Sequence, residues 1–305
     1  MANLRDISHR MASIRSTMQI TRTMEMISTA RIQRALQRAE DAAPYKDAIT
    51  NILANVAAVS SLSEFPLLIQ HQQEKSVLFI LIASDRGLAG GFNIVPQREV
   101  ERDMQKLAAQ GKQVSVITCG RKPTEYFSYR KTMPVLSFVG ISADPTRDEA
   151  ERIASYVIDS YTSGRVDRVV IKYWHAKNRM EQQLVTEQLL PLSREKLMMP
   201  NKPRNPEAMG EVALERFPTF SFEPSASEVL GYLIPSYIRT VIYHALLDSA
   251  AAEHGARRRA MQSATDNARE VLSGLERTYN RVRQSSITTE LNEIIGGAAA
   301  LEESN

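Results

Sequence analysis

The residues with the clearest potential for chemistry form a glycine-rich loop, Ser84–Asn93. The loop follows an apolar, β-branched run, Val77–Ala83, that predicts a buried strand, and it precedes a segment with a helical pattern. Phosphate-binding loops occupy this position in α/β proteins, because backbone N–H groups at a helix N-terminus attract anions. The loop matches neither G-x-G-x-x-G nor G-x-x-x-x-G-K-[ST], and it contains no lysine. The alternative is a tight turn whose glycines adopt positive φ, and the sequence leaves both interpretations open.

The other side chains that could do chemistry are scattered. No histidine has a metal-ligand spacing with another histidine or with the single cysteine, Cys119. One cysteine excludes a disulfide within the chain, and the nucleophile elbow G-x-S-x-G is absent. We therefore expect no catalytic, cofactor-binding or metal-binding residues and no cofactor. The five histidines are His9, His71, His175, His244 and His254.

An α/β domain must position the loop, and we place it at residues 76–192. Further strands are predicted at Val114–Thr118, Val135–Phe138 and Val169–Tyr173. Helices are predicted up to about Gln110 and from Asp144 and Pro145, an N-cap and first-turn pair, to Gly164. Alternating strands and helices favour a Rossmann-like α/β fold with a mostly parallel sheet.

The pattern of the N-terminal segment, residues 1–59, predicts a long helix. Its apolar stripe has 4-3-4 spacing and then drifts to Ile20, Met24 and Ile27. A helix of this length indicates a rod or coiled coil, in which Pro44 would form a kink or an interruption. The first part of the stripe consists of Ile7, Met11, Ile14 and Met18.

The C-terminal segment, residues 225–305, is predicted to form a second long helix. It follows a proline-rich segment, residues 193–224, that we interpret as a linker. Ser225 and Glu228 match a capping box, but Pro235 puts the helix start in doubt, and the proline-free stretch begins only at Ser236. Two helices this long cannot both bury their stripes against a small domain. We expect them to pack on each other as an antiparallel coiled coil. The heptad seam near the C-terminus consists of Ile287, Leu291, Ile294, Ala298 and Leu301.

Composition limits the function further. The chain has 305 residues, of which 43% are apolar, and a net charge of only +3, so a large core is available and nucleic acid is not required as a partner. No apolar run reaches the length of a membrane span, so we expect membrane contact only through partners. Arginines are concentrated in residues 1–40 and at Arg257, Arg258 and Arg259, where we expect some to meet acidic groups of a surrounding protein.

Three stretches together resemble the gamma subunit of F-type ATP synthases: Ile14–Met26, Ser84–Asn93, and Ala264–Ala268 continued by Tyr279–Ala298. The resemblance covers essentially the full length in order and spacing. It implies a non-catalytic central rotor shaft, present once per complex. In that family the shaft couples proton flow through the membrane sector to ATP synthesis or hydrolysis by rotating inside a hexamer of alpha and beta subunits. The implied partners are the alpha and beta subunits, the epsilon subunit and the ring of c subunits.

The resemblance also implies roles for single residues. Met24 matches a residue near a beta-subunit loop, and Phe220 falls where the family contacts the c ring. The C-terminal positions Ile294, Ala298 and Leu301 match an apolar bearing at the top of the hexamer. The N-terminus begins like that of a bacterial member, which implies a peripheral location on the cytoplasmic face of the cell membrane. The remaining rotor–stator contacts that it implies are Arg257, Gln284, Thr288 and Glu290.

Two other classes of protein remain open at this point. One is an α/β nucleotide-binding enzyme with helical extensions, which would use the Ser84–Asn93 loop. The other is a homodimeric coiled-coil scaffold, which would pair two copies of the long helices.

Overall fold

The computed structural model describes residues 4–59, 65–71, 73–178, 181–192, 223 and 225–302. The chain divides into two compact units. One contains Met1–Ser28 together with Arg257–Asn305, and the other contains Thr29–Ala256. The two longest helices, α1 (Leu4–Val59) and α6 (Ala226–Glu302), contribute to both units.

A five-stranded sheet forms the centre of the unit 29–256, with the strand order β3-β2-β1-β4-β5. All neighbouring strands are parallel except β4 and β5, which form an antiparallel pair. This arrangement confirms the predicted α/β fold with a mostly parallel sheet. β1 is central because it is an apolar run that is buried along almost all its length. The strands are β1 (Ser76–Ile82), β2 (Gln113–Cys119), β3 (Leu136–Phe138), β4 (Arg168–Ala176) and β5 (Gln182–Leu190).

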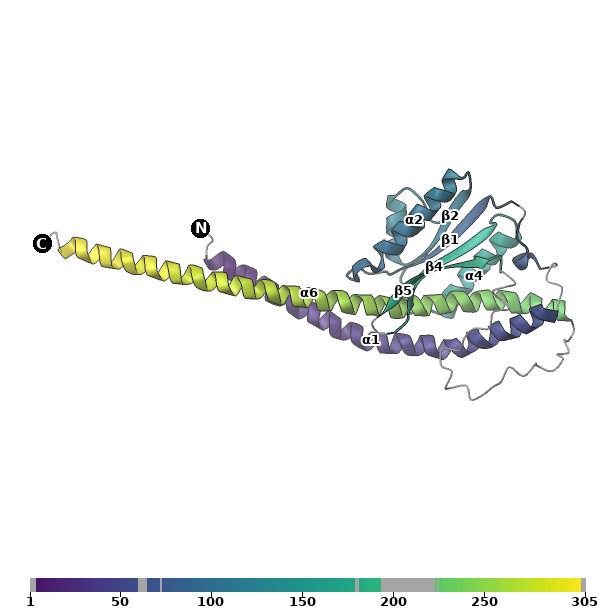
Figure 1. Ribbon diagram of the computed structural model, residues 1–305, viewed down its shortest axis with the longest axis horizontal. Helices are drawn as coiled ribbons and strands as arrows, with labels where there is room; N and C mark the ends of the chain where they lie inside the picture. The colour runs from purple at the N-terminus through teal and green to yellow at the C-terminus, as the bar shows by residue number, and fades with distance from the viewer. Residues whose placement is uncertain are drawn as a thin grey trace. The chain divides into compact units, whose positions relative to one another are not determined.

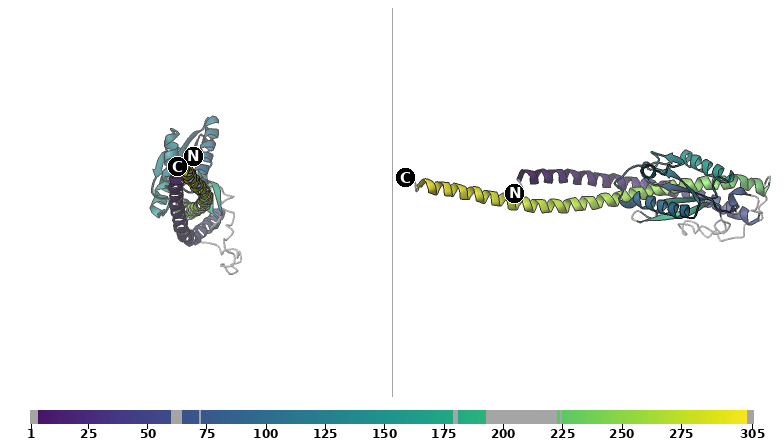
Figure 2. Two further views of the ribbon diagram at one scale, coloured as in Figure 1. Left: turned by 90° about the vertical axis from the view of Figure 1, so that its left-hand side faces the viewer. Right: turned by 90° about the horizontal axis from the view of Figure 1, so that it is seen from above.

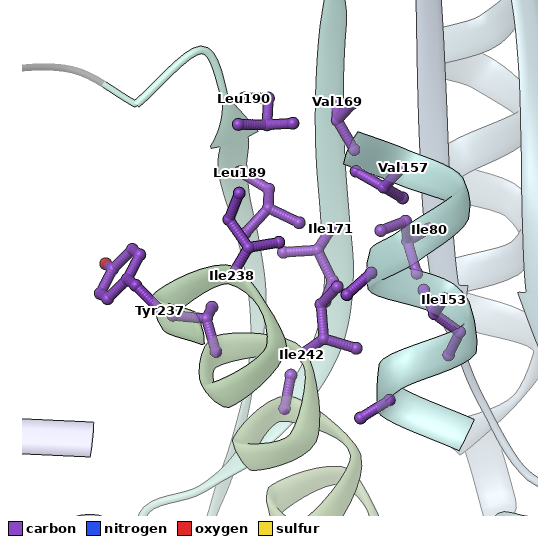
Figure 3. Close-up of a cluster of buried hydrophobic side chains, with 14 of the residues drawn as sticks. Ile80, Ile153, Val157, Val169, Ile171, Leu189, Leu190, Tyr237, Ile238 and Ile242 are labelled. Atoms are coloured by element: carbon purple, nitrogen blue, oxygen red, sulfur yellow. The ribbon is translucent and has the colours of Figure 1, made fainter. Parts of the chain in front are cut away.

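Helices cover both faces of this sheet. On one face, α2 (Ile94–Ala109) and α3 (Arg121–Tyr129) pack around Phe79, Val100 and Phe127. On the other face, a larger core joins α4 (Arg147–Thr162) with the end of α1 and the beginning of α6. Figure 3 shows Ile238 and Ile242 of α6 in this second core, pointing toward side chains of β4, β5 and α4. Two short 3₁₀ helices, η2 (Pro66–Leu68) and η3 (Gly90–Phe92), lie in the connecting loops.

The terminal helices have nearly the predicted bounds, and neither is interrupted at its proline. α1 is one helix of 56 residues with Pro44 inside it, so the predicted interruption is absent. α6 has 77 residues, begins at Ala226 and contains Pro235, so the helix starts at the capping box and not after the proline. The Ser225 hydroxyl accepts a hydrogen bond from the backbone N–H of Glu228 (3.2 Å), which confirms Ser225 as the N-cap. Packing of the first turns of α6 into the core offsets the hydrogen bond that Pro235 removes.

Three further details differ from the sequence prediction. α4 is capped by Thr146, whose capping box with Glu149 replaces the predicted cap at Asp144 and Pro145. The short helix α3 and the strand β5 were not predicted. The predicted linker, residues 193–224, lies almost wholly outside the described residues.

Candidate functional site on the loop and the terminal helices

The Ser84–Asn93 loop is held by contacts within itself and with β4. The side-chain oxygen of Asn93 accepts a hydrogen bond from the Ser84 backbone N–H (2.9 Å), and its amide nitrogen donates to the Arg86 carbonyl (3.2 Å). The Trp174 indole N–H donates to the Phe92 carbonyl (2.8 Å), and the two rings stack. The positive φ of Gly90, 58°, is the conformation expected of a tight turn.

The Asp85 carboxylate is bound by backbone N–H groups of the loops that follow β2 and β3. Its carboxylate accepts backbone N–H hydrogen bonds from Arg121 (2.8 Å), Gly140 (2.7 Å) and Ser142 (2.9 Å). Arg121 is the first residue of α3, so the helix N-terminus after β2 already faces an anion. The carboxylate therefore joins the loops that follow β1, β2 and β3.

The electrostatics of Asp85 follow from these contacts. Burial alone would raise the pKa of the carboxyl group, but hydrogen bonds from the Gly140, Ser142 and Arg121 backbones outweigh it and lower the pKa below its usual value. The backbone is also close here, since a Cβ on Gly120 would lie 2.5 Å from the Ala83 carbonyl oxygen. These contacts favour the tight-turn interpretation of the loop over the nucleotide-binding one.

The other candidates for chemistry are distributed through the core. Among the described residues, no group of three or more His, Cys, Asp or Glu side chains could hold a metal ion. Cys119 is buried at the end of β2, and burial raises the pKa of its thiol above the usual range. His175 pairs with the buried Asp248, which also accepts the Ala176 backbone N–H (3.0 Å), so this contact fastens α6 to the end of β4. No helix in the described part of the chain is long and apolar enough to cross a membrane.

Within the smaller unit, the beginning of α1 and the second half of α6 pack as an antiparallel pair. Thr21 and Thr265 form a buried hydroxyl–hydroxyl hydrogen bond (2.7 Å), and nearer the N-terminus Arg15 pairs with Glu276 (2.8 Å). Figure 1 shows the two helices running side by side with their chain directions opposed, and the right-hand view of Figure 2 agrees. This pairing confirms the predicted antiparallel coiled coil.

The buried stripe of α1 differs from the predicted drift. Heptad spacing continues from Ile7 through two polar residues, Thr21 and Ser28, which are 8% and 2% exposed. Ile20 and Ile27, which the drifting stripe included, are instead about half exposed. Each buried hydroxyl also donates to a carbonyl of its own helix, Met18 or Met24, so a polar residue can continue an apolar stripe.

α6 continues beyond the helix that it pairs with. The views in Figures 1 and 2 show its C-terminal part running past the first residues of α1. Ile287, Leu291 and Ile294 are 52–72% exposed there, although they form a heptad seam. The seam was predicted correctly as a pattern, but within the described residues of the unit no second helix covers it.

Most of the predicted contact residues lie on exposed helix surface. Gln284, Thr288, Glu290, Ile294 and Ala298 are exposed, and Met24 is partly buried. The Thr288 hydroxyl donates to the Gln284 carbonyl (2.9 Å), a bond within the helix that leaves both side chains at the surface.

Three predicted contact residues differ from this group. Arg257 is only 7% exposed, so its side chain is packed inside the chain rather than presented at the surface. Phe220 and the side chain of Leu301 lie outside the described residues. The structure brings the exposed residues together on one stretch of α6, and it leaves their roles as predictions.

The fold and these surfaces define a class of protein: a chain with an antiparallel pair of long terminal helices and an α/β unit whose Asp85 carboxylate is held by backbone N–H groups of its own loops. Comparison with known proteins narrows the class. The model of the ATP synthase family matches residues 3–301. The chain is 39% identical to the ATP synthase gamma chain of Pelotomaculum thermopropionicum over 99% of its length and 100% of that relative. It is 36% identical to the gamma chain of Streptomyces coelicolor over 100% of its length and 98% of that relative. The chain therefore belongs to the ATP synthase family, with full-length gamma chains as its relatives.

Solved structures agree on the fold. A chain in a structure of the Euglena gracilis mitochondrial ATP synthase, containing OSCP, F1 and the c-ring, aligns with a TM-score of 0.65 at 17% identity. That alignment covers 98% of this chain and 94% of the other. A chain from the central stalk and c-ring of the Tetrahymena thermophila enzyme aligns with a TM-score of 0.58 at 24% identity, over 80% of this chain and 99% of the other.

Proposed function

We propose that this chain is the central rotor shaft of an F-type ATP synthase. In this role it couples proton flow through the membrane sector to ATP synthesis or hydrolysis by rotating inside the hexamer of alpha and beta subunits. The chain performs no chemical step. Its surface biases the conformations of the subunits around it, which is a coupling of free energies between sites.

The observation that carries the proposal is the exposed apolar seam at the end of α6. Ile287, Leu291 and Ile294 repeat at heptad spacing and are at least half exposed. A soluble protein retains such a seam where another protein covers it. In a gamma chain the surrounding hexamer provides that cover, so the seam and Ala298 form the bearing of the shaft.

The rest of the contact surface follows from the same arrangement. We propose that Met24, Gln284, Thr288 and Glu290 contact the stator, since all but Met24 are exposed on α6. We propose that Arg257 acts indirectly, by fixing the packing of the helix from a buried position. The α/β unit and Phe220 face the epsilon subunit and the c ring, and one copy of the chain serves each complex on the cytoplasmic face of a bacterial membrane.

Two competing functions have less support. A nucleotide-binding enzyme would use the Ser84–Asn93 loop, but this loop matches neither phosphate-binding glycine pattern, and its Asp85 carboxylate is itself held by three backbone N–H groups. A homodimeric scaffold would pair the exposed seam of α6 in one copy with the same seam in a second copy. It would contain two copies of this chain, whereas a shaft is one copy in a complex of different subunits.

The test is purification of the tagged chain from its own membranes, with subunit stoichiometry and ATPase activity measured on the product. The rotor proposal expects three alpha, three beta and one copy of this chain in a complex that hydrolyses ATP. A symmetric homodimer, or a lone chain with no ATPase partner, would overturn it. Replacing Glu290 by Gln should then lower coupling between hydrolysis and proton pumping, while Glu181→Gln, an exposed control on the α/β unit, should not.

A further inference from the structure

A cavity in the unit 29–256 is lined by none of the residues proposed above to contact the other subunits. It lies between α1, the loop before α4 and α6, and its volume is about 350 Å³. α1 contributes Arg31, Arg34 and Arg38, while Asp144 and His254 come from the other two sides. All of these residues belong to the same compact unit.

The cavity carries more positive charge than its neighbours neutralise. Arg31, Arg34 and Arg38 are spaced by three and four residues, so they share one face of α1. Asp144 pairs with Arg38. Among the described residues, no carboxylate lies within ion-pair distance of Arg31 or Arg34. Like charges at these spacings repel one another, so the bare helix is destabilised at this face and a bound anion would relieve the repulsion.

The geometry of the donors selects the kind of anion. Each guanidinium presents a planar fork of N–H donors that fits a phosphate with two parallel hydrogen bonds. Two uncompensated arginines and a third shared with Asp144 suit an anion with two or more charges. The volume is at the lower end of the range for small-molecule sites, and Ala35, Pro145 and Ala250 supply apolar lining.

We propose that this cavity is a binding site for a small phosphate anion, with Arg31 and Arg34 as the principal ligands. The anion is either inorganic phosphate or pyrophosphate, or the phosphate chain of a nucleotide. The site is separate from the Ser84–Asn93 loop, where Asp85 already supplies the anion. A bound phosphate links α1 to the loop before α4 and to α6, and it stabilises the unit by mass action.

The test is isothermal titration of the purified full-length chain with inorganic phosphate, pyrophosphate and ADP, each in a low-chloride buffer. The variant is Arg31→Gln with Arg34→Gln. The matched control carries Arg22→Gln with Arg102→Gln, two exposed arginines that do not line the cavity. The wild type and the control are expected to bind one equivalent of at least one phosphate anion. The variant is expected to bind it at least ten times more weakly. Arg31→Lys with Arg34→Lys should bind with an affinity between those of the wild type and the variant, because the charge remains but the planar fork is lost.

The individual titrations distinguish the source of the phosphate. Binding of inorganic phosphate as tight as that of ADP identifies the free anion, and tighter binding of ADP identifies a nucleotide. The thermal midpoint should rise with the same ligand in the wild type and the control but not in the variant. Absence of saturable binding, equal loss in the control, or tighter binding of a synthetic acidic peptide than of any phosphate at the same arginines would overturn the proposal.

Discussion

The two halves of α6 belong to one continuous helix but are buried in different ways. In the unit 29–256, every residue from Val241 to Ala256 except Tyr243 and the glycine at 255 is a buried apolar or polar side chain. In the other unit, the described residues of α6 that are buried are Arg257, Met261 and Thr265, and beyond them the helix is partly buried or exposed. A helix that is buried all round is a core element, whereas one with a narrow stripe packs on a single partner.

This difference separates stability from function along one helix. The first half completes the core of the α/β unit together with α4, β4 and β5 (Figure 3). The second half packs a narrow stripe of residues against α1 and then carries the exposed apolar seam at its end. Mutations in the first half should therefore unfold the protein, and mutations in the second half should change what it does in a complex.

The largest expected effect is a cavity in the core half of α6. Ile238 is 0% exposed and packs in the core with Ile171 and Leu189. We expect Ile238→Ala to lower the free energy of unfolding by about 2–5 kcal/mol, because it removes buried methyl groups and leaves a cavity. Urea denaturation of the full-length chain measures this.

The matched control for that variant is Leu291→Ala on the exposed half of the same helix. It should change the free energy of unfolding by less than about 0.5 kcal/mol, because surface substitutions rarely do more. If the two variants were equally destabilised, the division of α6 into a core half and a functional half would be wrong.

A smaller effect is expected at Asp85, which joins three loops of the α/β unit. Asp85→Asn keeps the shape but loses the charge that three backbone N–H groups bind, so we expect a loss of about 1–3 kcal/mol at pH 7. The pKa of Asp85 is lower in the folded chain than in the unfolded one, so the unfolded state binds more protons and stability rises with pH.

The stabilising contribution of the Asp85 charge should depend on pH in a direction that can be tested. The contribution of the charge is fully present above the unfolded pKa of about 3.9 and is lost as the pH falls through the folded pKa. The difference between wild type and Asp85→Asn should therefore be constant from pH 7 to about 5 and then shrink in more acidic urea titrations. A difference that grew below pH 4 would contradict the assignment of the charge to the native state.

Much of the fold could be predicted because strong local patterns coincide with burial. The runs Val77–Ala83 and Val169–Tyr173 are mostly apolar and rich in β-branched residues, and they form the inner strands β1 and β4. β5 was not predicted because it is an edge strand in which polar residues such as Thr186 and Gln188 are exposed. The start of α4 was misplaced because Asp144 and Pro145 resemble a cap, while the Thr146 and Glu149 pair two residues later forms the capping box.

Features of the candidate site that follow from residue spacing could be predicted from the sequence. Features that depend on which groups each side chain contacts in the fold could not. The exposed seam at Ile287 and Leu291 was visible as heptad spacing, but its lack of cover depends on where α1 begins. The role of Asp85 depends on backbone N–H groups from Gly140 and Ser142, which no spacing in the sequence indicates. The burial of Thr21 contradicts an apolar stripe and is explained only by its bond to Thr265.

That bond gives the next prediction. Thr21→Val leaves the Thr265 hydroxyl with only its bond to the Met261 carbonyl, so we expect a loss of about 1 kcal/mol in the helix pair. The double variant Thr21→Val with Thr265→Val should recover most of the loss, because both partners become apolar and well packed. Native-state hydrogen exchange at amides near residues 21 and 265 measures the pair without unfolding the α/β unit. If the double variant lost more stability than the two single variants combined, Thr21 and Thr265 would not act as a simple hydrogen-bonded pair.

The smallest expected effect on stability, and a large one on function, is removal of the exposed end of α6. A chain that ends at Ser286 lacks Ile287, Leu291 and Ile294, none of which belongs to a core cluster among the described residues. Hydrogen-exchange protection of β1 and β4 should be unchanged, because their core is complete without these residues. In membrane vesicles that contain the assembled complex, proton pumping per ATP hydrolysed should fall, because the shaft has lost its bearing.

The full-length chain in the same vesicles is the control, and hydrolysis in detergent measures assembly independently of coupling. Loss of protection in β1 would show that the end of α6 supports the α/β unit after all. Unchanged pumping with intact protection would show instead that the apolar seam is not a bearing. The proposed contact surface would then be limited to Met24 and Gln284, which the shortened chain retains. Only a fall in pumping with β1 still protected assigns the exposed half of α6 to coupling and the buried half to stability.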